Sequence, residues 1–119
     1  MNIDLKDDFE IKEEGTWYSL PVYEVVDGKG IQVVEGAQVD LTFVRGSKLK
    51  DEEVPKREGT LHEHLLGAMI HDLKYKNSLV PSREGSIVIT KLEEAQQWLL
   101  KRQIERKKQN VEGTYKTHK

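Results

Sequence analysis

The chain has 119 residues, 36% hydrophobic and 34% charged, which fits one small domain with a modest core. Its 19 basic and 21 acidic side chains nearly balance, which argues against a surface coated with positive charge for nucleic-acid binding. Cysteine is absent, which excludes disulfides and thiolate chemistry, and no apolar run approaches membrane-spanning length, so we expect a soluble protein of a reducing cytoplasm.

Residues 1–46 predict a small antiparallel β region. Apolar and polar side chains alternate over 22–26, 31–34 and 39–43, and glycines mark expected turns at 27–30 and 35–36. This pattern predicts three short strands. Pro21 predicts that the first strand lies at a sheet edge or begins late, because proline cannot donate a ladder hydrogen bond.

Residues 47–59 are charged and contain Pro55, which predicts a connector between the sheet and the first helix. Thr60 and Glu63 then fit a capping box, in which the two side chains satisfy free amides at the start of a helix. Apolar residues at every fourth position carry this helix to about Lys76.

A second helix is predicted from Ser82, its N-cap, to about Lys108, followed by a basic tail over 109–119. A short loop between two helices favours an antiparallel hairpin, here spanning residues 60–119. The predicted fold class is therefore α+β, with a small N-terminal antiparallel β-sheet followed by a long C-terminal antiparallel helical hairpin.

The apolar stripe of the second helix ends in arginine. At 100° per residue, one narrow arc holds Val88, Leu92, Ala95 and Leu99, and Arg102 and Arg106 continue it. This cationic end is either a solvated overhang or a pocket for an anion. Other apolar residues exceed what one partner helix can cover, which predicts association with other copies: Ile87, Ile89, Trp98, Leu100 and Ile104.

Catalysis and metal binding have little support. The three histidines of the first helix, His62, His64 and His71, lack a zinc-site spacing with a further ligand. Glu93 and Glu94 fit a solvated helix surface, and neither a nucleophile motif nor a phosphate loop is present. We therefore expect no metal, no cofactor and no enzymatic activity.

Two positively charged groups suit an anion, and each has an ordinary structural alternative. Arg102 and Arg106, one helical turn apart, can converge on one phosphate or pair with acidic residues of a neighbouring helix. Arg83, beside Glu84, lies near helix amides that favour anions, or forms a surface ion pair at the cap.

Two further places suit a nucleotide base. Tyr75 can stack on a base or pack against the hairpin loop. Gly113 and Thr114 can meet base edges or belong to a plain tail.

The hairpin resembles the helical-hairpin domain shared by two groups of phage anti-defence sponges, one acting against Thoeris immunity and the other against CBASS. The strand region before it is similar to the Thoeris group. The resemblance rests on Leu65-Leu66, His71 to Tyr75, Arg83-Glu84, Thr90 to Ala95, Trp98-Leu99 and 111–114.

The resemblance implies a non-catalytic protein that seals a cyclic ADP-ribose isomer, made by a TIR-domain enzyme, inside a homo-oligomer in the infected bacterial host. Some relatives also hold cyclic trinucleotides at a second site and assemble as hexamers of dimer units. By position, Tyr75 is similar to the base-stacking aromatic, Arg83 and Glu84 to the loop-to-helix motif, and Arg102 and Arg106 to the phosphate-binding arginines.

Gly113 and Thr114 resemble the tail motif of the second site, Gly85 stands where relatives often carry asparagine, and Trp17 and Arg45 are strand positions that could line the pocket. Membranes and nucleic-acid polymers are not expected partners under this interpretation. Two alternatives stay open: a small regulatory protein whose basic helix contacts nucleic acid or a protein, and an enzyme that degrades the messenger.

Overall fold

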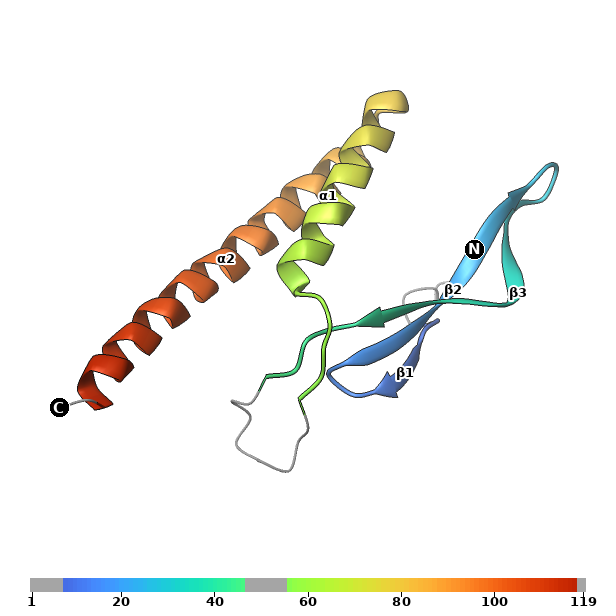
Figure 1. Cartoon of the computed structure of the whole chain (residues 1–119). Coiled ribbons are helices and arrows are strands. Elements are labelled where there is room, and N and C mark those ends of the chain that lie inside the picture. Colours follow the sequence, from blue (N-terminus) through green and yellow to red (C-terminus); the bar gives the residue numbers. More distant parts are fainter. Residues whose placement is uncertain (1–7, 47–55, 118–119) are drawn as a thin grey trace. The chain divides into compact units, whose positions relative to one another are not determined.

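The computed structural model describes residues 8–46 and 56–117, with side chains described as far as residue 108. The chain divides into two compact units, a β unit, Met1–Thr60, and a helical unit, Leu61–Lys119 (Figure 1). The α+β fold class is confirmed: three antiparallel strands precede two helices that form a hairpin.

The sheet has the order β1 (Glu10–Glu13), β2 (Trp17–Val26) and β3 (Gly30–Thr42), with β2 in the centre. The prediction that Pro21 marks an edge strand is therefore wrong. The central strand tolerates this proline because its β1 partner reaches only as far as Ser19, and because the β2–β3 register shifts between Pro21 and Tyr23.

The predicted turn at 35–36 is also wrong, because these residues lie within β3. Gly36 has a φ of +78°, a backbone conformation that favours glycine. Between the pairs Pro21–Gln38 and Tyr23–Val33, β3 has more residues than β2, so β3 bulges there and then continues as a strand. The third strand of the sheet is β1, which the alternation pattern did not predict.

Aromatic rings and one close backbone contact hold the β unit together. Tyr18 lies edge-on to both Phe9 and Phe43, with ring centroids 6.1 and 6.0 Å apart. The backbone of Phe43 passes so near Gly59 that a Cβ there would lie 2.4 Å from the Phe43 carbonyl carbon. Only glycine fits this position.

Residues 43–45 and 57–60 are joined by backbone hydrogen bonds. Arg45 and Arg57 each donate an amide to the other's carbonyl, at 3.0 and 3.1 Å, and Val44 donates to Thr60. Residues 47–55 of the predicted connector lie outside the described residues.

The helical unit consists of α1 (His62–Leu79) and α2 (Arg83–Thr117), joined by a three-residue loop. The predicted capping box is wrong: the N-cap of α1 is Leu61 without a side-chain cap, and Thr60 belongs to the β unit through its bond to Thr42. The predicted end of the second helix near Lys108 is also wrong, since α2 continues to Thr117.

The face of α2 that packs on α1 shares Leu92 and Leu99 with the predicted stripe but is rotated away from Val88 and Ala95. Ile89 is buried and Leu92, Gln96, Leu99 and Gln103 are half-buried, whereas the predicted stripe residues Val88 and Ala95 are exposed. Polar contacts between α1 and α2 determine which side of α2 faces α1.

Glu63 of α1 is buried, and its carboxylate accepts a hydrogen bond from Gln103 at 3.0 Å while its carbonyl accepts one from Gln96 at 3.2 Å. These two glutamines bring their side of α2 against α1, together with Ile89. The side of α2 that carries Val88, Ala95 and the two arginines does not face α1.

Candidate functional site

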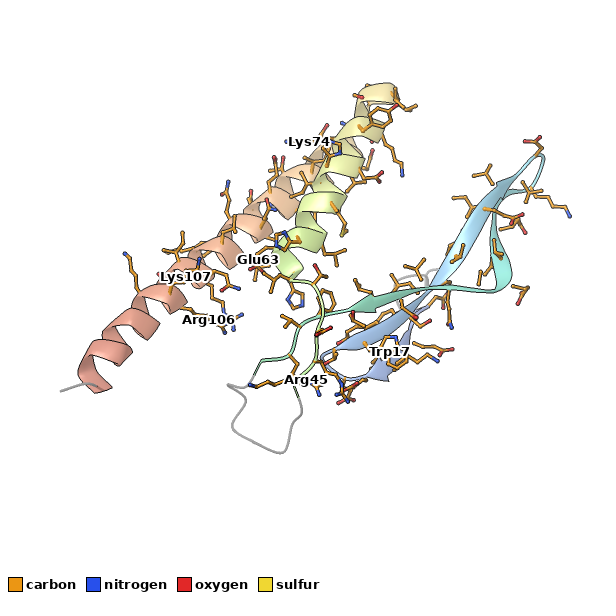
Figure 2. All side chains as sticks on the ribbon, in the orientation of Figure 1. Trp17, Arg45, Glu63, Lys74, Arg106 and Lys107 are labelled. Atoms are coloured by element: carbon orange, nitrogen blue, oxygen red, sulfur yellow. The ribbon has the colours of Figure 1, made fainter. Side chains whose placement is uncertain are left out.

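Arg102 and Arg106 lie on the exposed part of α2 near the start of α1. Gln103 of α2 is level with Glu63, and α2 continues beyond that level, as Figures 1 and 2 show. Both arginine side chains are exposed, and neither has an ion pair among the described side chains. Two adjacent guanidinium groups without partners can take up an anion.

Tyr75, Arg83 and Glu84 lie at the opposite end of the hairpin. All three are exposed, Tyr75 to 62%. From Arg83 to Arg102 the α2 axis extends about 28 Å at 1.5 Å per residue. One chain therefore does not bring the two groups of predicted site residues together around a small ligand.

The start of α2 is held by a hydrogen-bond network. The prediction that Ser82 is the N-cap of α2 is confirmed, because its hydroxyl accepts a hydrogen bond from the Gly85 amide at 2.9 Å. The Asn77 carboxamide of α1 accepts the Ser82 amide at 3.0 Å and donates to the Ser86 hydroxyl at 3.3 Å. Asn77 thus links the last turn of α1 to the first turn of α2.

Asn77 also explains why position 85 is glycine. A Cβ at Gly85 would lie 2.5 Å from the Asn77 Oδ1 and 2.9 Å from the Ser82 Oγ. Beside this network lies a hollow of about 400 Å³, lined by Leu73, Lys76, Asn77, Leu79, Val80, Ser82 and Gly85. Sequence reasoning missed Asn77, although an asparagine just before a short interhelical loop is a signal for local capping.

Arg45 has a structural role in the β unit. Its side chain is only 14% exposed, donates to Glu13 at 3.1 Å and also bonds the Glu14 carbonyl. Arg57 donates to the same Glu13 carboxylate at 3.2 Å. Trp17 is next to Glu13 in the β1–β2 register and stays partly exposed.

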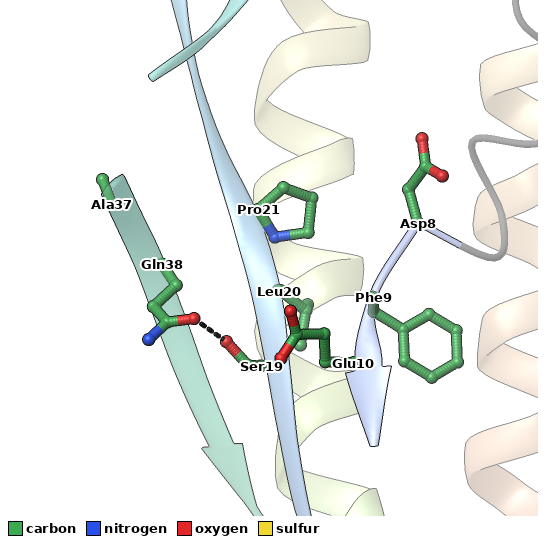
Figure 3. Close-up of a pocket in the computed structure, with 8 residues that line it drawn as sticks. All are labelled: Asp8, Phe9, Glu10, Ser19, Leu20, Pro21, Ala37 and Gln38. Atoms are coloured by element: carbon green, nitrogen blue, oxygen red, sulfur yellow. Dashed lines mark hydrogen bonds between the residues drawn. The ribbon is translucent and has the colours of Figure 1, made fainter. Parts of the chain in front are cut away.

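A second hollow, of about 430 Å³, lies on the sheet and is lined by Asp8, Phe9, Glu10, Ser19, Leu20, Pro21, Ala37 and Gln38 (Figure 3). A hydrogen bond from Lys12, reinforced by the charge of that lysine, lowers the pKa of Glu10 below its usual value. Glu10 therefore stays ionised, and with Asp8 beside it this hollow does not suit an anion.

Gly113 and Thr114 belong to α2 by their backbone, and nothing beyond the backbone is described there. Among the described side chains of residues 8–46 and 56–108, no group of three or more histidine, aspartate or glutamate residues could hold a metal ion. The described helices include none that is both long and apolar enough to cross a membrane.

Comparison with known proteins gives two matches. A curated relative named Thoeris anti-defense 1, from Bacillus phage SBSphiJ7, is 47% identical over 58 residues, which is 48% of this chain and 41% of that protein. The match thus spans less than half the length of the relative. The family model for the Acb2/Tad1 hairpin domain matches residues 43–103, slightly more than half of the chain. The protein therefore belongs to the Acb2/Tad1 hairpin-domain family.

Proposed function

We propose that this protein is a phage anti-defence protein that sequesters a cyclic nucleotide messenger of the host's immunity inside a homo-oligomer, without converting it. The messenger is a cyclic ADP-ribose isomer made by a TIR-domain enzyme, and a cyclic trinucleotide occupies a second site. Removing the messenger prevents activation of the Thoeris or CBASS effector in the cytoplasm of the infected bacterium. The name of the phage relative supports the anti-defence role.

The observation that carries this proposal is the pair of free guanidinium groups, Arg102 and Arg106, one turn apart on α2. A pyrophosphate offers oxygens to two guanidinium forks at once, which makes each hydrogen bond charge-assisted. Tyr75 supplies an exposed aromatic ring on which a base can stack. Because these residues lie at opposite ends of one hairpin, the proposed site takes them from different chains.

The experiment is to incubate the protein with extract of cells whose TIR enzyme has been activated, remove unbound material, and heat the protein. We expect mass spectrometry of the released material to show an intact cyclic ADP-ribose isomer. Linear ADP-ribose would instead point to an enzyme that degrades the messenger. The variant carrying both Arg102→Ala and Arg106→Ala is the matched control and should release none, and wild-type protein that also releases none would exclude the proposal.

A further inference from the structure

The start of α2 has a capping box that is divided between the two helices. In an ordinary capping box, the N-cap hydroxyl accepts a hydrogen bond from the amide three residues later, and the side chain at that later position accepts one from the N-cap amide. Ser82 and Gly85 make the first of these bonds, at 2.9 Å. Gly85 has no side chain for the second bond, and Asn77 of α1 makes it instead, because its Oδ1 accepts the Ser82 amide at 3.0 Å.

Asn77 and Gly85 depend on each other in this arrangement. A Cβ at position 85 would lie 2.5 Å from the Asn77 Oδ1, so the carboxamide fills the space in which the side chain of an ordinary capping box would begin. Asn77 also donates to the Ser86 hydroxyl at 3.3 Å, and that hydroxyl donates to the Ser82 carbonyl at 3.1 Å. Asn77 is therefore bonded to the residues on both sides of the first turn of α2.

A divided capping box has a consequence that an ordinary one lacks. An ordinary box lies within one helix, so it stabilises the start of that helix without joining it to a neighbour. Here the cap of α2 also fixes the last turn of α1 to the first turn of α2. Tyr75 lies two residues before Asn77, and Arg83 directly follows Ser82. Both side chains are exposed, so the separation of these two positions is set by the backbone that Asn77 holds.

We propose that Asn77 is a positioning residue of the messenger site, which holds Tyr75 and Arg83 at a fixed separation. This role rests on the proposed function, in which Tyr75 stacks on a base, and it assigns Arg83 to the same messenger as a further cation. A site whose groups are already in place loses less conformational freedom on binding. The fixed separation therefore contributes affinity without any contact between Asn77 and the messenger.

The test exchanges the divided capping box for an ordinary one. Asn77→Ala removes the acceptor of the Ser82 amide, and Gly85→Gln added to it supplies a new acceptor from within α2, in the space that the carboxamide has left. We expect Asn77→Ala to lower the melting temperature by about 4–8 °C, and the double variant to recover most of this loss. The affinity for a cyclic ADP-ribose isomer, measured by titration calorimetry, should nevertheless fall about tenfold in both variants.

A second measurement needs no messenger. The chain has no cysteine, so nitroxide labels on Tyr75→Cys and Arg83→Cys report the separation of these two positions by electron paramagnetic resonance. We expect a narrow distribution of distances when Asn77 is present, and a broader one in the labelled Asn77→Ala, Gly85→Gln variant although its α2 is capped. Ser78→Ala is the matched control in both measurements, because the Ser78 hydroxyl bonds only within α1, and it should leave affinity and distances unchanged.

Two results would overturn the positioning role. One is an affinity that recovers together with the melting temperature in the double variant, which would mean that Asn77 only caps α2. The other is a distribution of label distances that the loss of Asn77 leaves unchanged. If the distances respond as expected but the wild-type protein captures no messenger, the joining of the two helices by Asn77 holds and the proposed function fails.

Discussion

At the scale of single residues, Arg106 and Lys107 are neighbouring exposed cations that differ in the direction they face. One residue turns the helix by about 100°, so Lys107 points away from the stripe that Arg102 and Arg106 share. We expect Arg102→Ala and Arg106→Ala each to weaken messenger binding about 10- to 100-fold, the cost of a lost charge-assisted hydrogen bond.

Titration calorimetry measures this effect, and Lys107→Ala is the matched control, which should stay within about threefold of wild type. Unchanged affinity in both arginine variants would rule out the assignment of these guanidinium groups to the phosphates. Equal losses in all three variants would show that only the total charge of α2 matters.

Gly85 tests the cap of α2 at the same scale. Gly85→Ala forces a methyl group against the Asn77 carboxamide and the Ser82 hydroxyl, and we expect it to lower the free energy of unfolding by about 1–3 kcal/mol. In the Asn77→Ala background the nearer clash is gone, so the same substitution should cost less. Thermal denaturation of the four proteins measures the difference, and additive costs would contradict this account of the glycine.

At the scale of elements, the pairing of α1 with α2 depends on a buried carboxylate as well as on apolar contacts. Gln103→Ala removes the donor that reaches Glu63 at 3.0 Å and leaves a buried carboxylate short of a partner. We expect the free energy of unfolding to fall by about 1–3 kcal/mol. Urea denaturation measures this, with exposed Gln97→Ala as the control, which should lose no stability because alanine is the better helix former. An equal loss at Gln97 would contradict a specific role for the bond between Gln103 and Glu63.

The elements also show which features a pattern of residues can predict. Helix existence, the Ser82 cap and the strand regions follow from local chemistry, and the structure has them. The rotation of α2 does not follow from apolar periodicity, because the buried Glu63 turns Gln96 and Gln103 toward α1 and leaves Val88 outside. Polar contacts between distant residues are absent from any single helix pattern.

The sheet shows the same limit. β1 is short and mostly charged, so its pairing with β2 comes from register and not from an apolar pattern. The proposed site residues follow only from local motifs and from the resemblance of the hairpin to the family. Only the helical geometry reveals that Tyr75 and Arg102 lie at different ends of the hairpin, and the proposal that the site draws on more than one chain rests on that separation.

At the scale of the whole molecule, the chain joins two units whose charged residues are used differently. The helical unit carries the residues of the proposed site, and most of the family-model match, residues 43–103, lies within it. The β unit uses its own arginines internally, since Arg45 and Arg57 share Glu13. Assembly, in this scheme, decides whether the cations of α2 act as a binding site or remain scattered surface charges.

The backbone pairing of Arg45 with Arg57 has a practical consequence. Because two backbone hydrogen bonds hold residues 45 and 57 together, we expect the number of residues between them to have little effect on the sheet. Lengthening a closed loop costs only about 0.6 kcal/mol per doubling. We expect a purification tag or fluorophore inserted between residues 46 and 56 to leave this backbone pairing in place.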